Sequence, residues 1–406
     1  VNFVKKNYLK KELRSTGMAR LKGVVEKAYQ RHDNILLITS SLLIGFGIVM
    51  VASASLHLGA KEGDVMRYVD RHIFALGLGI AIGISAYMTP SKWWEKSSGW
   101  TYFIGLGLLL IVFLPGIGRE ANGAMRWVAV GSFSLQTSEF MKLFIVMYMA
   151  GYVVRRHLEV TNTIWGFIKP LILLLAACFL IMLQPDFGTT VVILATAFGM
   201  LFLAGAPLWQ FGLLLSFAGS FLAALIYFSP YRMARVTSFL NPWEQAQDAG
   251  YQLSQALIAF GRGEWTGVGL GNGIQKQFYL PEAHTDFVMA VIGEELGLLG
   301  TLVVIFLFSV FIWRAFSIGF LAEKQERKYA AFIAYGLGLW IGMQAFINIG
   351  VNMGILPTKG LTLPFISYGS NSLIVCCLAT GMLMRIHSEN YQSSEKHSKE
   401  GSWQRA

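Results

Sequence analysis

The stretch Pro281-Glu-Ala-His-Thr-Asp286-Phe-Val-Met-Ala-Val-Ile-Gly-Glu294-Glu295 joins a long polar segment to an apolar run that continues to about residue 313. A run of this length can cross a bilayer, yet it begins with one carboxylate and carries two more inside it. A carboxylate at the bilayer centre costs about 2.5 to 3.5 kcal/mol even on insertion scales, so it indicates a functional site by default. A single acid could equally be a loop-end aspartate that caps a helix. Three acids and a histidine within twelve residues favour function.

Composition places the whole chain in a membrane. Its 406 residues are 54% hydrophobic and 14% charged, with a mean hydropathy of +0.53. A water-soluble core of this size could not bury all of these apolar runs. We therefore predict an all-α polytopic membrane protein of about ten transmembrane helices. The candidate spans lie near 35–56, 73–89, 100–117, 140–154, 164–184, 187–205, 208–228, 286–313, 330–356 and 371–386.

The net charge of +10 follows this topology. With the N-terminus inside, and with Arg385 at the inner end of the last span included, twenty-one of the 33 Lys and Arg residues are cytoplasmic and ten fall outside. The positive-inside rule then makes both termini cytoplasmic. The chain divides into a basic tail 1–34, a transmembrane domain 35–386 and a C-terminal tail 387–406. A charge distributed in this way does not indicate a nucleic-acid partner, and the basic N-terminus lacks the features of a removed signal peptide.

The three cysteines indicate no special chemistry. Cys178, Cys376 and Cys377 all lie in apolar runs and lack the Cys/His spacing of a metal site. We interpret them as small hydrophobic residues, without a disulfide framework.

The longest connection, 229–285, is predicted to be an ordered extracytoplasmic loop. Asn241-Pro-Trp-Glu244 has a capping asparagine, a proline at the first helical position and an acid at the third, which predicts a short helix. Tyr251 to Phe260 has apolar residues at helical spacing and predicts a second helix that ends at Gly261. This helix could lie on the membrane surface or pack on other spans.

Glycines recur from Gly261 to Gly273 in this loop. Neither the Gly-x-Gly-x-x-Gly spacing nor a strand-to-helix context is present, so a dinucleotide fold is not predicted. Glycine does permit close approach of the backbone to a ligand. A backbone cradle for a diphosphate remains open, with Arg262 and Lys276 as counter-charges.

Ionisable residues recur at the predicted outer ends of the spans. Glu139 and Lys142 are spaced i,i+3 and can pair on one helix face. Gln344, Asn348 and Asn352 lie along another span, where they could be ligands or contacts between helices. Proline and glycine interrupt several span ends, and broken backbone at membrane depth requires a cover of protein or water. We predict a polar cavity that opens outward beneath the loop. The other members of this group are Asp186, Glu294, Glu295 and Lys359.

At these motifs the sequence resembles the SEDS family (shape, elongation, division and sporulation) over about residues 33 to 387. The local sequence around Leu280-Pro-Glu-Ala-His284 resembles the cell-division members of the family more than the rod-elongation members. Other motifs that carry the resemblance are Met125-Arg-Trp127, Gln136-Thr-Ser-Glu139 with Lys142, Gln184-Pro-Asp186-Phe-Gly188, Asn241-Pro-Trp243, Gly250-Tyr-Gln252, Gly293-Glu-Glu-Leu-Gly297 and Leu356-Pro-Thr-Lys-Gly-Leu-Thr-Leu-Pro-Phe-Ile-Ser-Tyr-Gly369.

The resemblance implies ten helices and polymerisation of lipid II into glycan strands on the outer face of the bacterial cytoplasmic membrane, at the division septum. It implies a catalytic aspartate at Asp286. It also implies a class B penicillin-binding protein, a transpeptidase, as partner, together with other divisome proteins. The chain departs from the family's usual sequence at two sites: Thr137 replaces a proline, and Ser370-Asn371 replaces Gly-Ser.

We predict that Asp286 is the general base on the acceptor hydroxyl. Substrate contacts are predicted from Arg126, Lys142, Arg262, His284 and Lys359. Structural or charge-tuning roles are predicted for Glu139, Asp186, Glu294 and Glu295. A divalent cation, Mg²⁺ or Mn²⁺, could bridge diphosphate oxygens on ligands that the sequence does not identify, and no organic cofactor is expected.

Three alternatives remain open. A lipid II flippase would carry polar groups through the whole bilayer and paired broken helices in its two halves, whereas here the polar groups crowd at the outer ends. A rod-elongation paralogue would catalyse the same reaction elsewhere in the cell. A divisome scaffold would use the charged tails as contacts for partners or anionic lipid, and this role is compatible with catalysis.

Overall fold

The computed structural model describes residues 32–121, 124–130, 133–227, 239, 241–244, 246–248, 250–357 and 360–403. The predicted tail 1–34 lies outside these residues except for its last three, and Lys359 also lies outside them.

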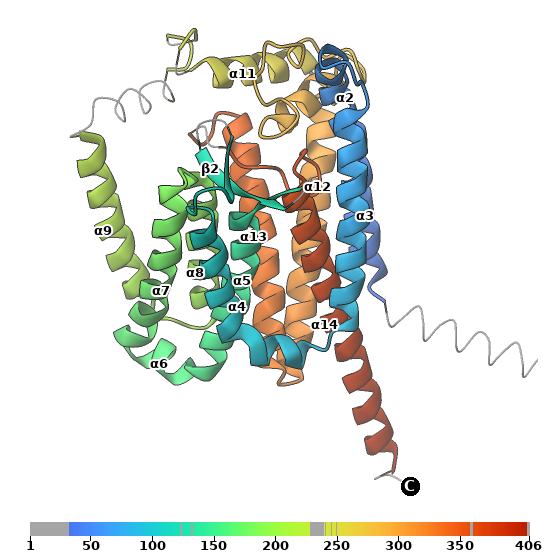
Figure 1. The fold of residues 1–406 in the computed structure, drawn as a ribbon. Helices are drawn as coiled ribbons and strands as arrows, with labels where there is room; N and C mark the ends of the chain where they lie inside the picture. The colour runs from blue at the N-terminus through green and yellow to red at the C-terminus, as the bar shows by residue number, and fades with distance from the viewer. Residues whose placement is uncertain are drawn as a thin grey trace, which may run out of the picture.

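The described residues form a bundle of long helices (Figure 1). Each predicted span falls on one helix, and six of these helices are long and apolar enough to cross a membrane by length and composition. The polytopic helical membrane fold is therefore confirmed, although the count of ten crossings stays a prediction. The ten helices are α2 (Asn34–Lys61), α3 (Arg67–Met88), α4 (Ser91–Ile111), α5 (Thr137–Arg155), α7 (Ile164–Leu183), α8 (Phe187–Leu203), α9 (Leu208–Tyr227), α12 (Val288–Lys324), α13 (Lys328–Asn352) and α14 (Ser370–Trp403).

A small antiparallel sheet follows α4, in a segment for which no secondary structure was predicted. Its strands are β1 (Gly118–Ala121), β2 (Ala124–Val130) and β3 (Phe133–Gln136), in the order β1-β2-β3. Trp127 of β2 faces Gln136 of β3, and β3 continues directly into α5. The sheet therefore lies at one end of the bundle, on the helix that carries Glu139 and Lys142 (Figure 1).

The long loop is ordered in part as predicted. Helix α11 (Tyr251–Gly263) matches the second predicted helix and lies across the end of the bundle (Figure 1). The predicted helix at Asn241 is wrong, because the described residues of 242–248 form turns. The Asn241 side chain donates to the Glu244 carboxylate at 3.0 Å, so its side-chain amide bonds a side chain there. A short helix, α6 (His157–Asn162), lies between α5 and α7.

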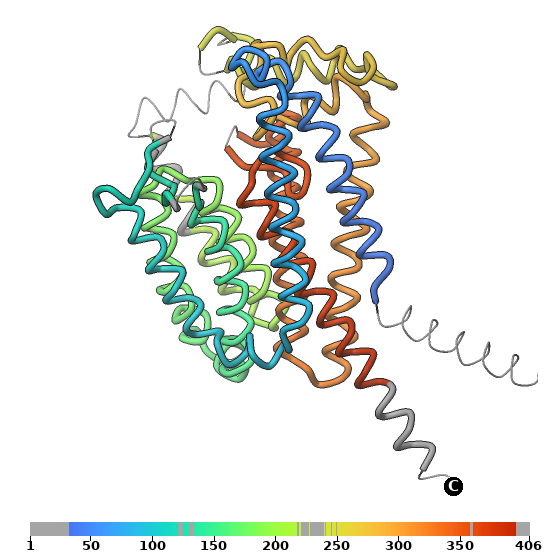
Figure 2. Tube along the Cα trace, turned by 45° about the vertical axis from the view of Figure 1, so that its right-hand side comes forward, coloured from blue at the N-terminus to red at the C-terminus, as the bar shows by residue number. Residues whose placement is uncertain are grey.

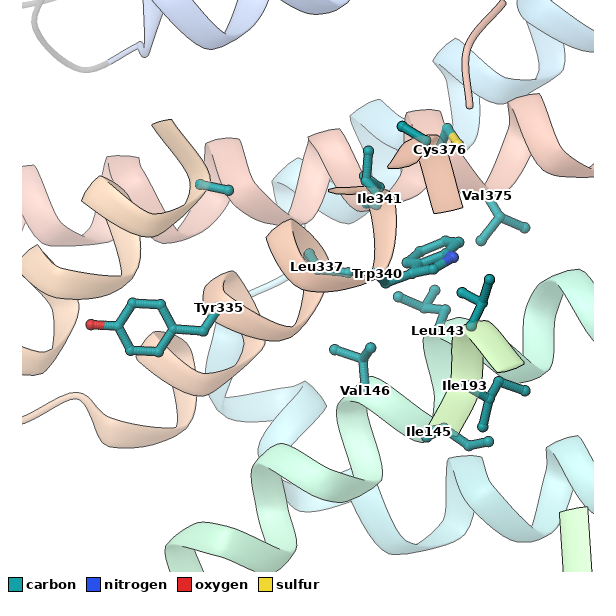
Figure 3. Packing of buried hydrophobic residues seen from close by; sticks show 14 of the residues in the cluster. Leu143, Ile145, Val146, Ile193, Tyr335, Leu337, Trp340, Ile341, Val375 and Cys376 are labelled. Carbon is teal, nitrogen blue, oxygen red and sulfur yellow. The ribbon is translucent and has the colours of Figure 1, made fainter. Parts of the chain in front are cut away.

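Helices α5 and α13 form the centre of the bundle. Trp340 of α13 is 1% exposed and packs among Leu143 and Val146 of α5 and Ile193 of α8 (Figure 3). Lipid tails are as apolar as these side chains, so close packing rather than removal from water holds such a core together. The centre is therefore a rigid support for polar groups at the ends of these helices.

Charged groups join the helices at the end opposite to the sheet and α11. Asp33 caps α2 through the N–H of Leu36 at 3.1 Å and accepts from Arg314 of α12 at 2.5 Å. His387 of α14 approaches the same carboxylate at 3.6 Å. The start of α2 and the last part of α14 therefore lie at one end of the molecule, where α14 extends beyond the bundle (Figure 2).

Candidate active site

Asp286 lies in the turn immediately before α12 and is half-buried. Two amides of α13 hold its main chain: Asn348 Nδ2 and Asn352 Nδ2 donate to the Asp286 carbonyl at 2.9 and 3.0 Å. Asn352 Oδ1 also accepts from the N–H of Ala290 at 3.1 Å. These asparagines, for which the spacing left two interpretations, are contacts between segments. They fix the backbone of Asp286 and leave its carboxyl group unconstrained by them.

The segment before α14 holds the same turn from a second side. Ser367 Oγ donates to the Thr285 carbonyl at 2.5 Å, and the Tyr368 N–H donates to the His284 carbonyl at 2.9 Å. Gly360 lies so close that an added Cβ would be 2.8 Å from Asp286 Oδ2. The sequence predicted no role for Gly360, which is distinguished only by following the broken end of α13.

The surroundings raise the pKa of Asp286 to about 7. Burial contributes most, the charges of Glu282 and Asp186 add to it, and Arg126 opposes it. A carboxyl group with a pKa near the working pH is suited to accept a proton from a hydroxyl group. The sequence predicted Asp286 as the base without identifying Glu282 as a neighbouring charge.

Asp186 and Arg126 are positioned by the loop between α7 and α8. Asp186 caps α8 through the N–H of Thr189 at 3.1 Å and accepts from Ser138 Oγ at 3.1 Å. Arg126, on β2, donates to the carbonyls of Gln184 at 2.8 Å and Pro185 at 2.6 Å. The structure therefore brings a predicted substrate cation and a predicted structural acid together near Asp286.

Glu139 and Lys142 form the predicted pair, with Lys142 Nζ 2.8 Å from Glu139 Oε1. Lys142 Nζ also donates to Gln344 Oε1 at 2.7 Å, and Gln344 Nε2 donates to the Thr362 carbonyl at 2.9 Å. Lys142 is only 2% exposed. Its ammonium therefore connects α5, α13 and the segment before α14, and substrate contact from Lys142 would require these bonds to rearrange.

The glycine-rich segment forms a cradle, but its occupants are two carboxylates of the chain itself. Arg262 lies 2.5 Å from Glu294 Oε1, and Lys276 lies 2.5 Å from Glu295 Oε1. Both acids are fully buried. The geometry therefore gives Arg262 and Lys276 partners other than a diphosphate. Backbone N–H groups at 2.9 to 3.3 Å complete the cradle, from Gly271, Gly273, Ile274 and Gln275.

The cradle covers a break in α12. Gly297 has φ +65°, a left-handed conformation that favours glycine, and it interrupts the helix two residues after Glu295. The N–H groups of Leu298 and Leu299 donate to the carbonyls of Glu264 and Trp265 at 2.9 and 3.1 Å. Protein therefore covers the broken backbone, as membrane depth requires.

His284 belongs to a group of three rings beside Asp286. Its ring centroid lies 5.3 Å from that of Tyr68 and 5.5 Å from that of Tyr368. Burial lowers the pKa of His284, so the imidazole is neutral at pH 7. A neutral imidazole can still donate or accept one hydrogen bond to a substrate. The sequence missed Tyr68, which lies more than two hundred residues from the motif.

The described residues do not fit an all-protein metal centre. Within them, no three His, Cys, Asp or Glu side chains are grouped closely enough to hold an ion. The predicted outward cavity stays a prediction, since a hollow of about 310 Å³ lies instead beside α11 and the break of α12, against Leu257, Phe260 and Leu298.

Comparison with known proteins agrees with this arrangement. The family model described as cell cycle protein, FtsW/RodA/SpoVE, matches residues 33–392. "Probable peptidoglycan glycosyltransferase FtsW" of Allochromatium vinosum is 54% identical over 385 residues, which cover 94% of this chain and 96% of the relative. The protein of the same name from Nitrosococcus halophilus is 54% identical over 358 residues, covering 88% and 92%.

A solved structure shares the fold. It is described as "Structural coordination of polymerization and crosslinking by a peptidoglycan synthase complex", and one of its chains superposes with a TM-score of 0.73 at 27% identity, covering 89% of this chain and 99% of that one. The resemblance inferred from the sequence motifs is thereby confirmed. The chain belongs to the FtsW/RodA/SpoVE family of cell cycle proteins, and within it is similar to the FtsW members.

Proposed function

We propose that this protein is a peptidoglycan glycosyltransferase that polymerises lipid II into glycan strands for septal cell-wall synthesis. The observation that carries the proposal is Asp286, a half-buried carboxyl group whose pKa is raised to about 7 and whose main chain is fixed by two asparagine amides. The names of the relatives, probable peptidoglycan glycosyltransferases, support the same reaction class.

In this mechanism Asp286 removes the proton from the 4-hydroxyl group of one disaccharide. The resulting oxygen nucleophile attacks the anomeric carbon of a second disaccharide, and the bond to the lipid diphosphate breaks. A single displacement converts an α-linked donor into a β-linked product, by the logic of inverting glycosidases. The position of Asp286, outside α12 and at the loop end of the bundle, suits two sugars that are anchored to lipid in the outer leaflet.

Positive charge for the leaving diphosphate is best supplied by Arg126, which is half-buried and close enough to lower the pKa of Asp286. Arg262 and Lys142 are held by Glu294 and Glu139. A divalent cation, Mg²⁺ or Mn²⁺, would need the diphosphate oxygens of the substrate as its main ligands, in the manner usual for magnesium. No step of the mechanism depends on it.

We place the protein in the bacterial cytoplasmic membrane at the division septum, with both termini cytoplasmic and a class B penicillin-binding protein as its partner among the divisome proteins. The cluster of Asp33, Arg314 and His387 supports a common side for the two chain ends. The solved synthase complex supports the proposal that this protein acts together with a partner, since the description of that complex couples polymerization with crosslinking.

The test is lipid II polymerisation by the protein purified with its partner. Asp286→Asn keeps the size of the side chain and removes the base, so we expect the rate to fall by at least about a hundredfold, with lipid II binding retained. Asp286→Ala should lower the polymerisation rate to the same extent. Asn241→Ala, which alters an exposed loop contact, is the matched control and should keep the wild-type rate. An undiminished rate for Asp286→Asn would reject the assignment.

The same preparation separates the flippase alternative. Wild-type protein that moves labelled lipid II between leaflets without forming glycan strands would favour a transporter. Lys142, Asp186 and Asp286 lie near the starts of α5, α8 and α12, toward the same end of the bundle, and this arrangement favours the polymerase.

A further inference from the structure

Asn371 occupies a position at which this chain departs from the residue that is usual in the family. It lies in the first turn of α14 and is 7% exposed. Its Nδ2 donates to the backbone carbonyl of Ser134, in β3, at 2.8 Å. Ser134 is paired with Ala129 of β2 on its other side, so the amide bonds the free edge of the sheet. Serine, which is usual here, has a shorter side chain that ends in a hydroxyl group and lacks the amide Nδ2 that makes this bond.

The helix end that carries Asn371 is fixed to the turn of Asp286. Ser367 and Tyr368, a few residues earlier, bond the carbonyls of Thr285 and His284. These two carbonyls belong to the residues immediately before Asp286. A displacement at the start of α14 would therefore be transmitted to the Asp286 carboxylate through these two hydrogen bonds, one from the Ser367 hydroxyl and one from the Tyr368 N–H.

Strand β3, whose edge Asn371 bonds, is connected through β2 to the guanidinium group of Arg126. β3 pairs with β2, which carries Arg126, and Arg126 in turn bonds the loop that ends at Asp186. Without the Asn371 amide, the sheet is still continuous with α5, but nothing described at its free β3 edge ties it to α14.

We propose that Asn371 is a positioning residue, whose amide ties the sheet carrying Arg126 to the segment carrying Asp286 and so sets the separation of guanidinium and carboxylate. This inference rests on the proposed function. It assigns a catalytic consequence to a residue that touches neither the substrate nor the reacting atoms.

The consequence has a definite sign. Of the charged groups that face Asp286, Glu282 and Asp186 raise its pKa and Arg126 lowers it. If the sheet moves away, the opposing effect of Arg126 weakens and the pKa of Asp286 rises further. The base is then protonated over a wider range of pH, so the acidic limb of the pH–rate profile moves to higher pH.

The experiment compares Asn371→Ala and Asn371→Ser with wild-type protein, each purified with its partner, in lipid II polymerisation across pH. We expect kcat/KM at neutral pH to fall about fivefold, the factor that the net value of one hydrogen bond gives. We also expect the midpoint of the acidic limb to rise by a few tenths of a pH unit. The matched control is Asn272→Ala, because Asn272 Nδ2 also donates to a backbone carbonyl, that of Val268 at 3.3 Å, but on the exposed loop. It should leave the midpoint unmoved.

A residue that merely stabilises the fold would reduce the amount of active protein without moving this midpoint. The inference is therefore overturned if both Asn371 variants keep the wild-type midpoint. If wild-type protein itself forms no glycan strands, the proposed function fails instead, so the two failures are distinguishable.

Discussion

Asp286 is held by its main chain rather than by its side chain. The two α13 amides bond its carbonyl, so the carboxyl group can change partner during the reaction while the backbone stays in place. The spacing of Asn348 and Asn352 was visible in the sequence. Their common partner was not, because Asp286 precedes them by more than sixty residues and one sequence contains no information on such a contact.

The raised pKa of Asp286 predicts how stability depends on pH. Its pKa is about 7 in the folded chain and about 3.9 in an unfolded one. Between these values the folded state binds more protons, so this residue lowers the free energy of unfolding as the pH rises. We expect Asp286→Asn to raise the thermal midpoint in detergent at pH 7.5 and to change it little near pH 4. A thermal midpoint that falls at pH 7.5 would contradict a disfavoured charge on the half-buried Asp286.

Thr137 predicts a stabilising substitution. It is the first residue of α5, and its hydroxyl is buried without a described hydrogen-bond partner. Gln136 before it has the extended conformation that a residue before proline prefers. Proline is favoured at a first helical position. We expect Thr137→Pro to stabilise the protein by about 0.5 to 1 kcal/mol.

Thr163→Pro is the matched control for this measurement. Thr163 caps α7 through the N–H of Gly166 at 3.2 Å, and its own N–H bonds Glu159. Proline at position 163 would remove both bonds and should lower the thermal midpoint of unfolding, whereas Thr137→Pro should raise it. If both substitutions lowered the thermal midpoint equally, the inference that position 137 is suited to proline would be refuted.

At the scale of elements, the broken helix α12 and the glycine-rich segment form one unit. The sequence identified the parts, namely acids in a span and glycines in a loop, but left open a backbone cradle for a diphosphate. The reason is physical: backbone N–H groups bond a carboxylate as readily as a phosphate. Only the fold reveals that Glu294 and Glu295 reach them first.

Gly297→Ala should disrupt this unit. A Cβ at this position would lie 2.5 Å from the N of Gly267 and would have to adopt φ +65°. We expect a loss of about 2 kcal/mol or more, with faster proteolysis within 261–276. Gly45→Ala on α2, where an added Cβ meets nothing within 4 Å, should be neutral or slightly stabilising. Equal effects of the two substitutions would contradict the role of the break.

The strands between α4 and α5 were outside what the sequence could predict. They are only four to seven residues long and are stabilised by one another and by Arg126 and Asn371. Short strands of this kind have little periodicity, and their pairing is decided by contacts with distant segments. The long helices, by contrast, were predicted from apolar length alone.

At the scale of the whole molecule, the two ends of the bundle differ in character. Helix α11 and the sheet lie toward one end of the bundle (Figure 1). Asp286 precedes α12 at this end, whereas Asp33, which bonds Arg314, precedes α2 at the other end. From the distribution of Lys and Arg, the sequence predicts which of the two ends is cytoplasmic, because membrane insertion responds to loop charge rather than to tertiary contacts. This orientation stays a prediction.

Sidedness can be measured with introduced cysteines, since Cys178, Cys376 and Cys377 are all buried and give little background. Trp265→Cys, at a position that is 70% exposed, should react with a membrane-impermeant maleimide in intact spheroplasts. Glu326→Cys, in the exposed turn between α12 and α13, should react only after the membrane is opened. The reverse pattern would invert the topology.

The cradle also bears on how the chain enters the membrane during synthesis. Arg262 precedes Glu294 by 32 residues and Lys276 precedes Glu295 by 19, which is a few seconds at ordinary rates of translation. Ser53, which donates to Glu295, is made 242 residues earlier. Every partner of the two acids among the described residues has therefore left the ribosome before α12 is inserted. The order of the chain lets this helix meet its counter-charges as it enters, so its buried acids need not wait for a later segment.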